Sequence, residues 1–247
     1  NMAAGDLARN LAKLEDAVER AAAQGADLLV APELALPGYG AGYAMAQLAE
    51  PEGGAQTTAL KAMALRHGVA IVAGLAESSC AEVYNAAVFT DGARYVIYRK
   101  SHLYGDYERG LFRPGEPAAV TFDFKGVRCG MLICYDVEFP ENVRRLAQAG
   151  AQVVLTPTAA PAGPTADFIS EHVIPVRAFE NQVFVAYADH CGGDGRFEFA
   201  GRSHVAGPDG GTLAIAGRDE ALLIADLDPA AYDASRCENP YLTDLRT

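Results

Sequence analysis

The first part of the chain alternates helical and strand patterns. Apolar residues recur at spacings of three and four, at Leu7, Leu11, Leu14, Val18 and Ala22. Residues 6–23 therefore predict an amphipathic helix that Asp6 caps and Gly25 ends. The apolar run at residues 28–31 predicts a buried strand. The unit then repeats as a helix at residues 56–67 and a strand at residues 69–75.

The remainder of the chain mixes hairpin strands with further helices. Asp91-Gly92 is a two-residue turn signal, so residues 83–90 and 93–100 predict an antiparallel hairpin. Further strands are expected at residues 119–124, 127–134, 153–156, 183–188, 197–205, 213–216 and 222–226, and helices at 140–150 and 167–181. Pro175 should kink or divide the last helix. Residues 101–117 predict a long loop, a candidate lid.

This alternation favours an α/β fold, with mixed sheets and helices outside them. The sequence has 247 residues, 50% of them hydrophobic, which is enough for a sizeable core. Residues 1–247 are expected to form a single domain, with residues 229–247 as its C-terminal tail. The net charge of −12 and the lack of a basic cluster disfavour nucleic acid as a partner.

Apolar runs and cysteines indicate the compartment. No run approaches the roughly 18 apolar residues that span a bilayer, so no membrane association is expected. Residues 1–10 do not have the pattern of a secretory signal. The five cysteines are scattered, with no C-x-x-C pair, as is typical of a reduced cytoplasmic protein. The histidines lack metal-ligand spacing, so no metal is expected.

Three polar residues stand where predicted strands end: Glu33, Lys100 and Cys134. Each has an ordinary interpretation, as a surface acid, a solvated strand end and a small core residue. Together they have the chemistry of acyl transfer. A thiol needs a base to remove its proton and a cation to stabilise the charge on a carbonyl oxygen. The sequence thus predicts that these three side chains meet in one sheltered pocket.

Three ordered segments resemble the signatures of the nitrilase superfamily of carbon-nitrogen hydrolases. They are APEL at residues 31–34, YRKSHL at 98–103 and GMLICYDVEFPE at 130–141. The resemblance implies a four-layer αββα sandwich, with Cys134 as nucleophile, Glu33 as general base and Lys100 as transition-state stabiliser. It also implies that Glu108 positions substrate or water and that the Tyr135 backbone N–H is the second oxyanion donor. An ordinary solvated charge is the alternative for Glu108.

The residues after Cys134 resemble those of amide-cleaving members, since true nitrilases usually carry Cys-Trp-Glu there. The expected reaction is therefore hydrolysis of a small-molecule amide to a carboxylic acid and ammonia through a thioester, without a cofactor. Members of the superfamily normally open with a strand before the first helix, and residues 1–5 are too short to supply it. The resemblance also implies a homodimer or larger assembly, with residues 229–247 at the interface.

Residues that flank the motifs in the chain are expected to bind substrate. These are Tyr39, Tyr104, Tyr135, Glu138, Phe139 and Thr158, with Tyr107, Phe112 and residues 159–164 as further lining. Asp136, Glu138 and Glu141 form an acidic group, which we interpret as charge favoured at the N-terminus of the helix at 140–150. Cys129 is expected in the core.

Several alternatives remain open. The chemistry could act on N-carbamoyl compounds or nitriles, transfer the acyl group to another amine, or be lost in a binding module on the same fold. A Cys134-His102 dyad is disfavoured because no thiol-protease signature surrounds either residue. Residues 38–42 depart from the dinucleotide-binding glycine pattern and are read as a flexible pocket rim, and residues 201–205 lack the second glycine of a nucleophile elbow.

Overall fold

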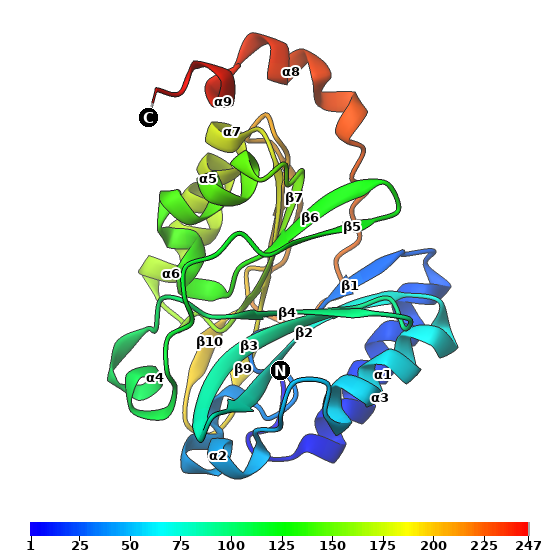
Figure 1. Cartoon of the computed structure of the whole chain (residues 1–247), viewed down its shortest axis with the longest axis vertical. Helices are drawn as coiled ribbons and strands as arrows, with labels where there is room; N and C mark the ends of the chain where they lie inside the picture. The colour runs from blue at the N-terminus through cyan, green and yellow to red at the C-terminus, as the bar shows by residue number, and fades with distance from the viewer. Residues whose placement is uncertain (247) are drawn as a thin grey trace.

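Two β-sheets lie face to face between two layers of helices in the computed structural model, which describes residues 1–246 (Figure 1). The first sheet has the order β1-β2-β3-β4. Its strands are β1 Leu28–Val30, β2 Ala70–Ser79, β3 Glu82–Thr90 and β4 Tyr95–Arg99. β1 is parallel to β2, and the other neighbours are antiparallel.

The second sheet is six-stranded, with the order β12-β11-β8-β7-β6-β5. Its strands are β5 Thr121–Phe124, β6 Val127–Met131, β7 Val153–Thr158, β8 Phe184–Asp189, β11 His204–Ala206 and β12 Thr212–Ile215. β6, β7 and β8 run parallel. A separate ribbon pairs β9, Cys191–Gly193, with β10, Glu198–Ala200.

Alternation along β2 explains why the first sheet is covered on both faces. Ile71 and Ala73 belong to the core shared with Leu14 of α1 and Leu60 of α3, whereas Val72 belongs to the core between the sheets. α1 spans Leu7–Ala23 and α3 spans Ala55–His67. These helices and the predicted hairpin agree with the sequence prediction, including the Asp6 side chain that accepts a hydrogen bond from Arg9 N at 3.0 Å.

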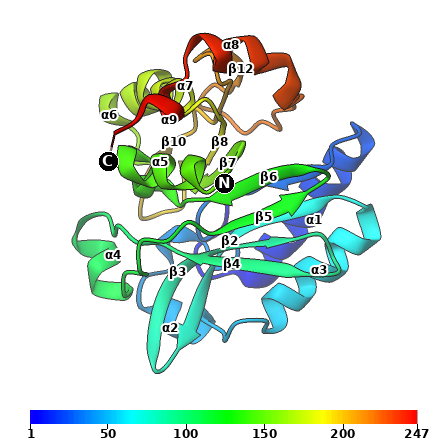
Figure 2. The same ribbon diagram turned by 45° about the horizontal axis from the view of Figure 1, so that its top comes forward.

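The second sheet is covered by α5, Pro140–Gln148, and by one long helical stretch. That stretch comprises α6 Pro164–Phe168, a π-helical turn Ile169–Val173 and α7 Ile174–Asn181. Pro175 lies in the first turn of α7 and lacks a backbone N–H, so the division predicted there takes the form of the wider turn before it. In Figure 2 the strands lie between the α1–α3 pair and the group of α5, α6 and α7.

The four-layer αββα fold is thus confirmed, while several local predictions were wrong. Residues 101–117 contain the helix α4, Gly105–Leu111, in place of a continuous loop. Residues 197–205 divide into β10 and β11, because Gly201 and Arg202 turn the chain at φ 69° and 59°. Residues 38–42, the predicted pocket rim, lie within or directly before a 3₁₀ helix, Tyr39–Ala44, that is interrupted at Gly42.

The predicted strand at residues 222–226 is also absent from the described structure. This stretch pairs with no described strand, and it lines a cavity of about 460 Å³ together with residues of β1, β6, β7 and β8. Residues 1–6 form no strand either, as the sequence predicted.

The remaining elements are short helices. They are α2 Met45–Leu48, a 3₁₀ helix Pro229–Tyr232, α8 Asp233–Glu238 and α9 Tyr241–Asp244. Within residues 1–246 no helix combines the length and apolar character needed to cross a membrane.

Candidate active site

Glu33 follows β1 in a turn that packs directly on β2. The backbone of Glu33 and Leu34 lies so close to Gly74 of β2 that a side chain at position 74 would collide with it. The His190 ring contacts the Glu33 carbonyl oxygen, with 2.7 Å between Nε2 and O. These contacts fix Glu33 at the carboxyl end of β1, with its side chain fully buried.

Lys100 lies directly after β4 and between two carboxylates. Its Nζ donates to Glu33 Oε1 at 2.6 Å and to Glu108 Oε1 at 2.7 Å, and all three side chains are 0% exposed. An unpaired charge at this depth would be strongly destabilising, so the arrangement depends on all three groups. Glu108 is therefore not the solvated loop charge that was its alternative interpretation.

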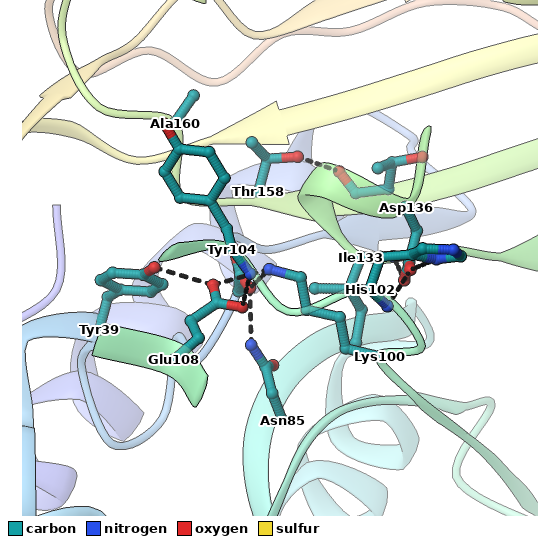
Figure 3. A network of polar contacts seen from close by, with 12 residues as sticks. Tyr39, Asn85, Lys100, His102, Tyr104, Glu108, Ile133, Asp136, Thr158 and Ala160 are labelled. Carbon is teal, nitrogen blue, oxygen red and sulfur yellow. Dashed lines mark hydrogen bonds and ion pairs between the residues drawn. The ribbon is translucent and has the colours of Figure 1, made fainter. Parts of the chain in front are cut away.

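Glu108 comes from α4, and further donors hold its carboxylate. Tyr39 Oη donates to Oε1 at 2.8 Å, and Tyr104 N donates to Oε2 at 2.8 Å. Figure 3 shows Tyr39, Lys100 and Tyr104 meeting at this carboxylate. The helix missed in the sequence thus brings Glu108 to Lys100.

The charges of the cluster determine its protonation. Burial raises the pKa of Glu33 to about 7, against the lowering effect of Lys100 and in the same direction as Glu108. Burial alone lowers the pKa of Lys100, but the charges of Glu33 and Glu108 outweigh it and raise that pKa well above its ordinary value. Lys100 stays charged, while Glu33 can take up or release a proton near neutral pH.

Cys134 begins the 3₁₀ turn Cys134–Glu138 after β6, three residues beyond the end of the strand at Met131. The prediction that Cys134 closes the strand was therefore wrong. Its backbone has φ 47°. Burial raises the pKa of its thiol well above the ordinary value; the Glu33 and Glu108 charges add to the rise, and the Lys100 charge opposes it. The thiol is neutral at rest and needs a base before it can attack.

Asp136 links the turn Cys134–Glu138 to the end of β4. We call this turn the nucleophile turn, after the role predicted for Cys134. Its Oδ1 accepts from Ser101 Oγ at 2.9 Å and His102 N at 2.9 Å, and its Oδ2 accepts from Tyr98 Oη at 2.9 Å and Ile133 N at 3.2 Å. Figure 3 shows Asp136 beside His102. Interpreting Asp136 as helix N-terminal charge was wrong, because its carboxylate is 0% exposed and bonded to another segment.

Replacing Asp136 with asparagine is expected to destabilise the fold by about 3 kcal/mol, since an amide NH₂ would face donors that now have a carboxylate. Turnover should fall by roughly 10- to 100-fold, because the Cys134 turn would shift relative to Lys100. Thermal unfolding and kcat measure the two effects. Glu141→Gln, at an exposed acid of α5, is the control, and an Asp136→Asn variant as stable as that control would contradict the prediction.

The predicted substrate-binding residues fall into a buried group and a more accessible group. Tyr39 and Thr158 are buried, and their hydroxyls are bonded within the protein, to Glu108 and to the Thr156 carbonyl. Tyr104 is 44% exposed, and Tyr135, Glu138 and Phe139 are half-buried. The Tyr135 ring lies 5.2 Å from the Tyr104 ring and 4.9 Å from the Phe139 ring. This aromatic group lies beside the nucleophile turn.

The other predicted lining residues are divided: Ala159 and Ala160 are buried, whereas Pro161, Ala162 and Pro164 are exposed. Phe112 is 4% exposed and packs in a core with Tyr107. The Tyr107 hydroxyl donates to the Tyr39 carbonyl at 2.7 Å. Cys129 is buried in the core, as predicted. His102 interacts with Asp136, with 3.0 Å between Nδ1 and Oδ1, and stacks on Phe139 at 4.0 Å.

The sequence interpretation missed two buried residues that hold Glu33. Asn85 donates to Glu33 Oε1 at 2.6 Å, and His190 contacts the Glu33 backbone. Asn85 could have been noticed as the single amide within an otherwise apolar half of β3. His190 gave no signal, because a lone histidine after a strand is usually structural.

The arrangement has the components of acyl transfer through a thioester. A neutral thiol lies in a buried site with a carboxylate that titrates near neutrality and an ammonium that stays charged. Glu33 Oε2 is buried and accepts no hydrogen bond from the described residues. That oxygen is therefore free to accept a proton from the thiol or from water.

Comparison with known proteins gives consistent matches. The carbon-nitrogen hydrolase family model matches residues 1–236. An (R)-stereoselective amidase of Pseudomonas sp. is 39% identical over 98% of this chain and 87% of its own length. A 2-oxoglutaramate amidase of Bacillus subtilis is 35% identical over 98% and 93%. A cysteine-to-alanine mutant of a nitrilase-superfamily amidase from Nesterenkonia is 36% identical, with a TM-score of 0.89 over 100% of this chain and 91% of that one.

Proposed function

The chain belongs to the carbon-nitrogen hydrolase family, and on that basis we propose that it is an amidase that hydrolyses small-molecule amides. The bonds it acts on are carbon-nitrogen bonds other than peptide bonds. The observation that carries the proposal is the ammonium of Lys100, fully buried between the carboxylates of Glu33 and Glu108 in the site that holds Cys134.

In the first step Glu33 takes the thiol proton as the Cys134 sulfur attacks the amide carbonyl. Lys100 has three N–H donors, of which Glu33 and Glu108 accept two, and the third can meet the developing oxyanion. The second oxyanion donor is the Tyr135 backbone N–H, a role that comes from the family pattern. Glu108 holds Lys100 in place through its link to Tyr39.

In the second step the carbon-nitrogen bond breaks and Glu33 returns its proton to the departing ammonia. The acyl group remains on Cys134 as a thioester. Glu33, again ionised, then takes a proton from water, whose oxygen attacks the thioester and releases the carboxylic acid. The proton passes back to the sulfur, which restores the enzyme. A carboxyl group with a pKa near neutrality suits both directions of transfer.

Ammonia release from a panel of small neutral amides, with intact-mass detection of the acyl group on Cys134, tests this function. Nitriles and N-carbamoyl compounds in the same panel distinguish the related activities, and added hydroxylamine reveals acyl transfer as a hydroxamate. A protein that neither releases ammonia nor becomes acylated would be a binding module on this fold.

The pKa of Glu33 leads to a pH prediction. Below about pH 7 its carboxyl group is protonated and cannot accept the thiol proton. We expect kcat/KM to rise by about tenfold per pH unit through the acid range and to level off above neutrality. The measurement uses a neutral amide between about pH 5 and pH 9, with circular dichroism to confirm folding. An activity that stays constant down to pH 5 would exclude Glu33 as the base.

We also propose a homodimer or larger assembly in a reducing compartment such as the cytoplasm. Phe168 and Val176, on the α6–α7 stretch, are 59% and 49% exposed, which supports an association surface. The cysteines of the chain are free thiols, with Cys80 and Cys237 exposed, which supports reducing surroundings. Light scattering should give at least twice the mass of one chain, and a fixed monomer mass would contradict the assembly.

A further inference from the structure

The nucleophile turn ends in a carboxylate for which the described residues supply no partner. Glu138 is the last residue of the turn that begins at Cys134, and it is half-buried. Among residues 1–246 no hydrogen bond or ion pair reaches its carboxylate. Arg177 is close but is engaged elsewhere: it donates to the carbonyl oxygens of Val137 and Glu138 and to the Glu180 carboxylate.

Glu138 lies four residues beyond Cys134 in the same 3₁₀ turn, and its charge interacts with groups of the buried site. Burial raises its pKa, and the charges of Lys100 and Arg177 oppose that rise. Burial also raises the pKa of the Tyr187 phenol, with added effects from Asp189, Cys134 and Glu138. Glu138 and Cys134 therefore share two electrostatic neighbours, Lys100 and Tyr187.

With Glu33 ionised, the site holds more carboxylates than ammonium groups. Lys100 is the only buried lysine or arginine among the described residues, and Glu33 and Glu108 already bind it. Glu138 adds a negative charge that Lys100 and Arg177 stabilise only from a distance, since no lysine, arginine or histidine among the described residues forms an ion pair with it. An anionic substrate would be repelled there, whereas an ammonium group would form a charge-assisted hydrogen bond.

Aromatic residues close to Glu138 in the chain could also bind a cation. Phe139 follows it directly, and the Tyr135 ring contacts both the Phe139 and Tyr104 rings. Aromatic rings attract cations through their electron-rich faces, so rings next to a carboxylate form a common recognition site for ammonium groups.

We propose that Glu138 determines specificity, by selecting amides that carry a protonated amine on the acyl side over neutral and anionic amides. This inference rests on the proposed amidase function and names its substrate class. It gives Glu138 no part in bond making: the residue binds the amine and so orients the carbonyl at Cys134.

The test compares isosteric substrates at one pH near 7, where an α-amine is mostly protonated and Glu33 still accepts a proton. Alaninamide is paired with isobutyramide, 4-aminobutanamide with pentanamide, and succinamate with succinamide. For at least one amine length, kcat/KM of the native protein should be at least about tenfold higher for the ammonium amide than for its neutral isostere. Succinamate should react more slowly than succinamide.

Glu138→Gln should lower the ammonium-to-neutral ratio by about tenfold, and Glu138→Lys should raise the succinamate-to-succinamide ratio by a similar factor. Glu141→Gln removes a nearby exposed charge as the matched control and should change either ratio by less than about twofold. Ratios cancel any general loss of activity in a variant.

The outcomes separate this inference from the function beneath it. If neutral amides acylate Cys134 but the native ratios are near one, or Glu138→Gln leaves them unchanged, the specificity role is overturned and the amidase stands. If no amide in the panel acylates Cys134, the amidase function fails and the inference fails with it.

Discussion

Replacing Cys134 with alanine is expected to lower ammonia release by at least about 10⁴-fold, since neither water nor another side chain replaces a positioned nucleophile. The acyl adduct seen by intact mass should disappear with the activity. Stability should change little, because alanine removes one buried sulfur from a residue that is already 9% exposed. The measurement combines an ammonia assay, intact mass and thermal unfolding.

Cys129→Ala is the matched control, because Cys129 is a buried thiol in β6, the strand directly before the turn that begins at Cys134. That variant should keep both activity and the acyl adduct, even if it is less stable. Turnover that survives in Cys134→Ala, or an acyl group found on Cys129, would overturn the nucleophile assignment and with it the proposed mechanism.

Replacing Lys100 with methionine is expected to remove activity and to cost about 3 to 5 kcal/mol of folding free energy. The variant leaves the carboxylates of Glu33 and Glu108 buried without their shared cation, so at least one must take up a proton. Turnover should fall by at least about 10³-fold, because the oxyanion loses its charged donor. Chemical denaturation and kcat measure the two effects.

A double variant separates the structural effect from the chemical one. Adding Glu108→Gln to Lys100→Met removes one of the two unpaired carboxylates, so part of the lost stability should return while activity stays absent. Lys61→Met, at a half-buried lysine of α3, is the control and should be close to native in both measurements. A Lys100→Met protein of native stability would show that the buried ion cluster is not the arrangement in solution.

Local signals in the sequence predicted most of the scaffold. The Asp91-Gly92 turn fixed the hairpin of β3 and β4, and Asp6 marked the start of α1, because each of these features depends on a few neighbouring residues. The strand at residues 222–226 could not be excluded in the same way. Its continuous run of apolar residues, Leu222 to Ala225, is typical of a buried strand. A strand also needs a partner, and pairing is not a local property.

The sequence identified the main residues of the candidate site but not the long-range contacts that hold them. The three motifs indicated which side chains to consider, and the structure places Glu33 and Lys100 in direct contact, with Cys134 in the same buried site. The roles of Asp136 and Asn85 could not be predicted, since their partners lie tens of residues away in the chain. α4 was missed because it is a single short helix whose first residue is Gly105 and which has no side-chain cap.

The backbone of the nucleophile has a consequence for how this protein can change over time. Cys134 has φ 47°, a region that favours glycine, and holding another residue there costs of the order of 1–3 kcal/mol. Selection for heat resistance alone would drive this position toward glycine, which has no sulfur. Catalysis and thermal stability therefore favour different residues at position 134. Stabilising substitutions must be sought elsewhere in the chain.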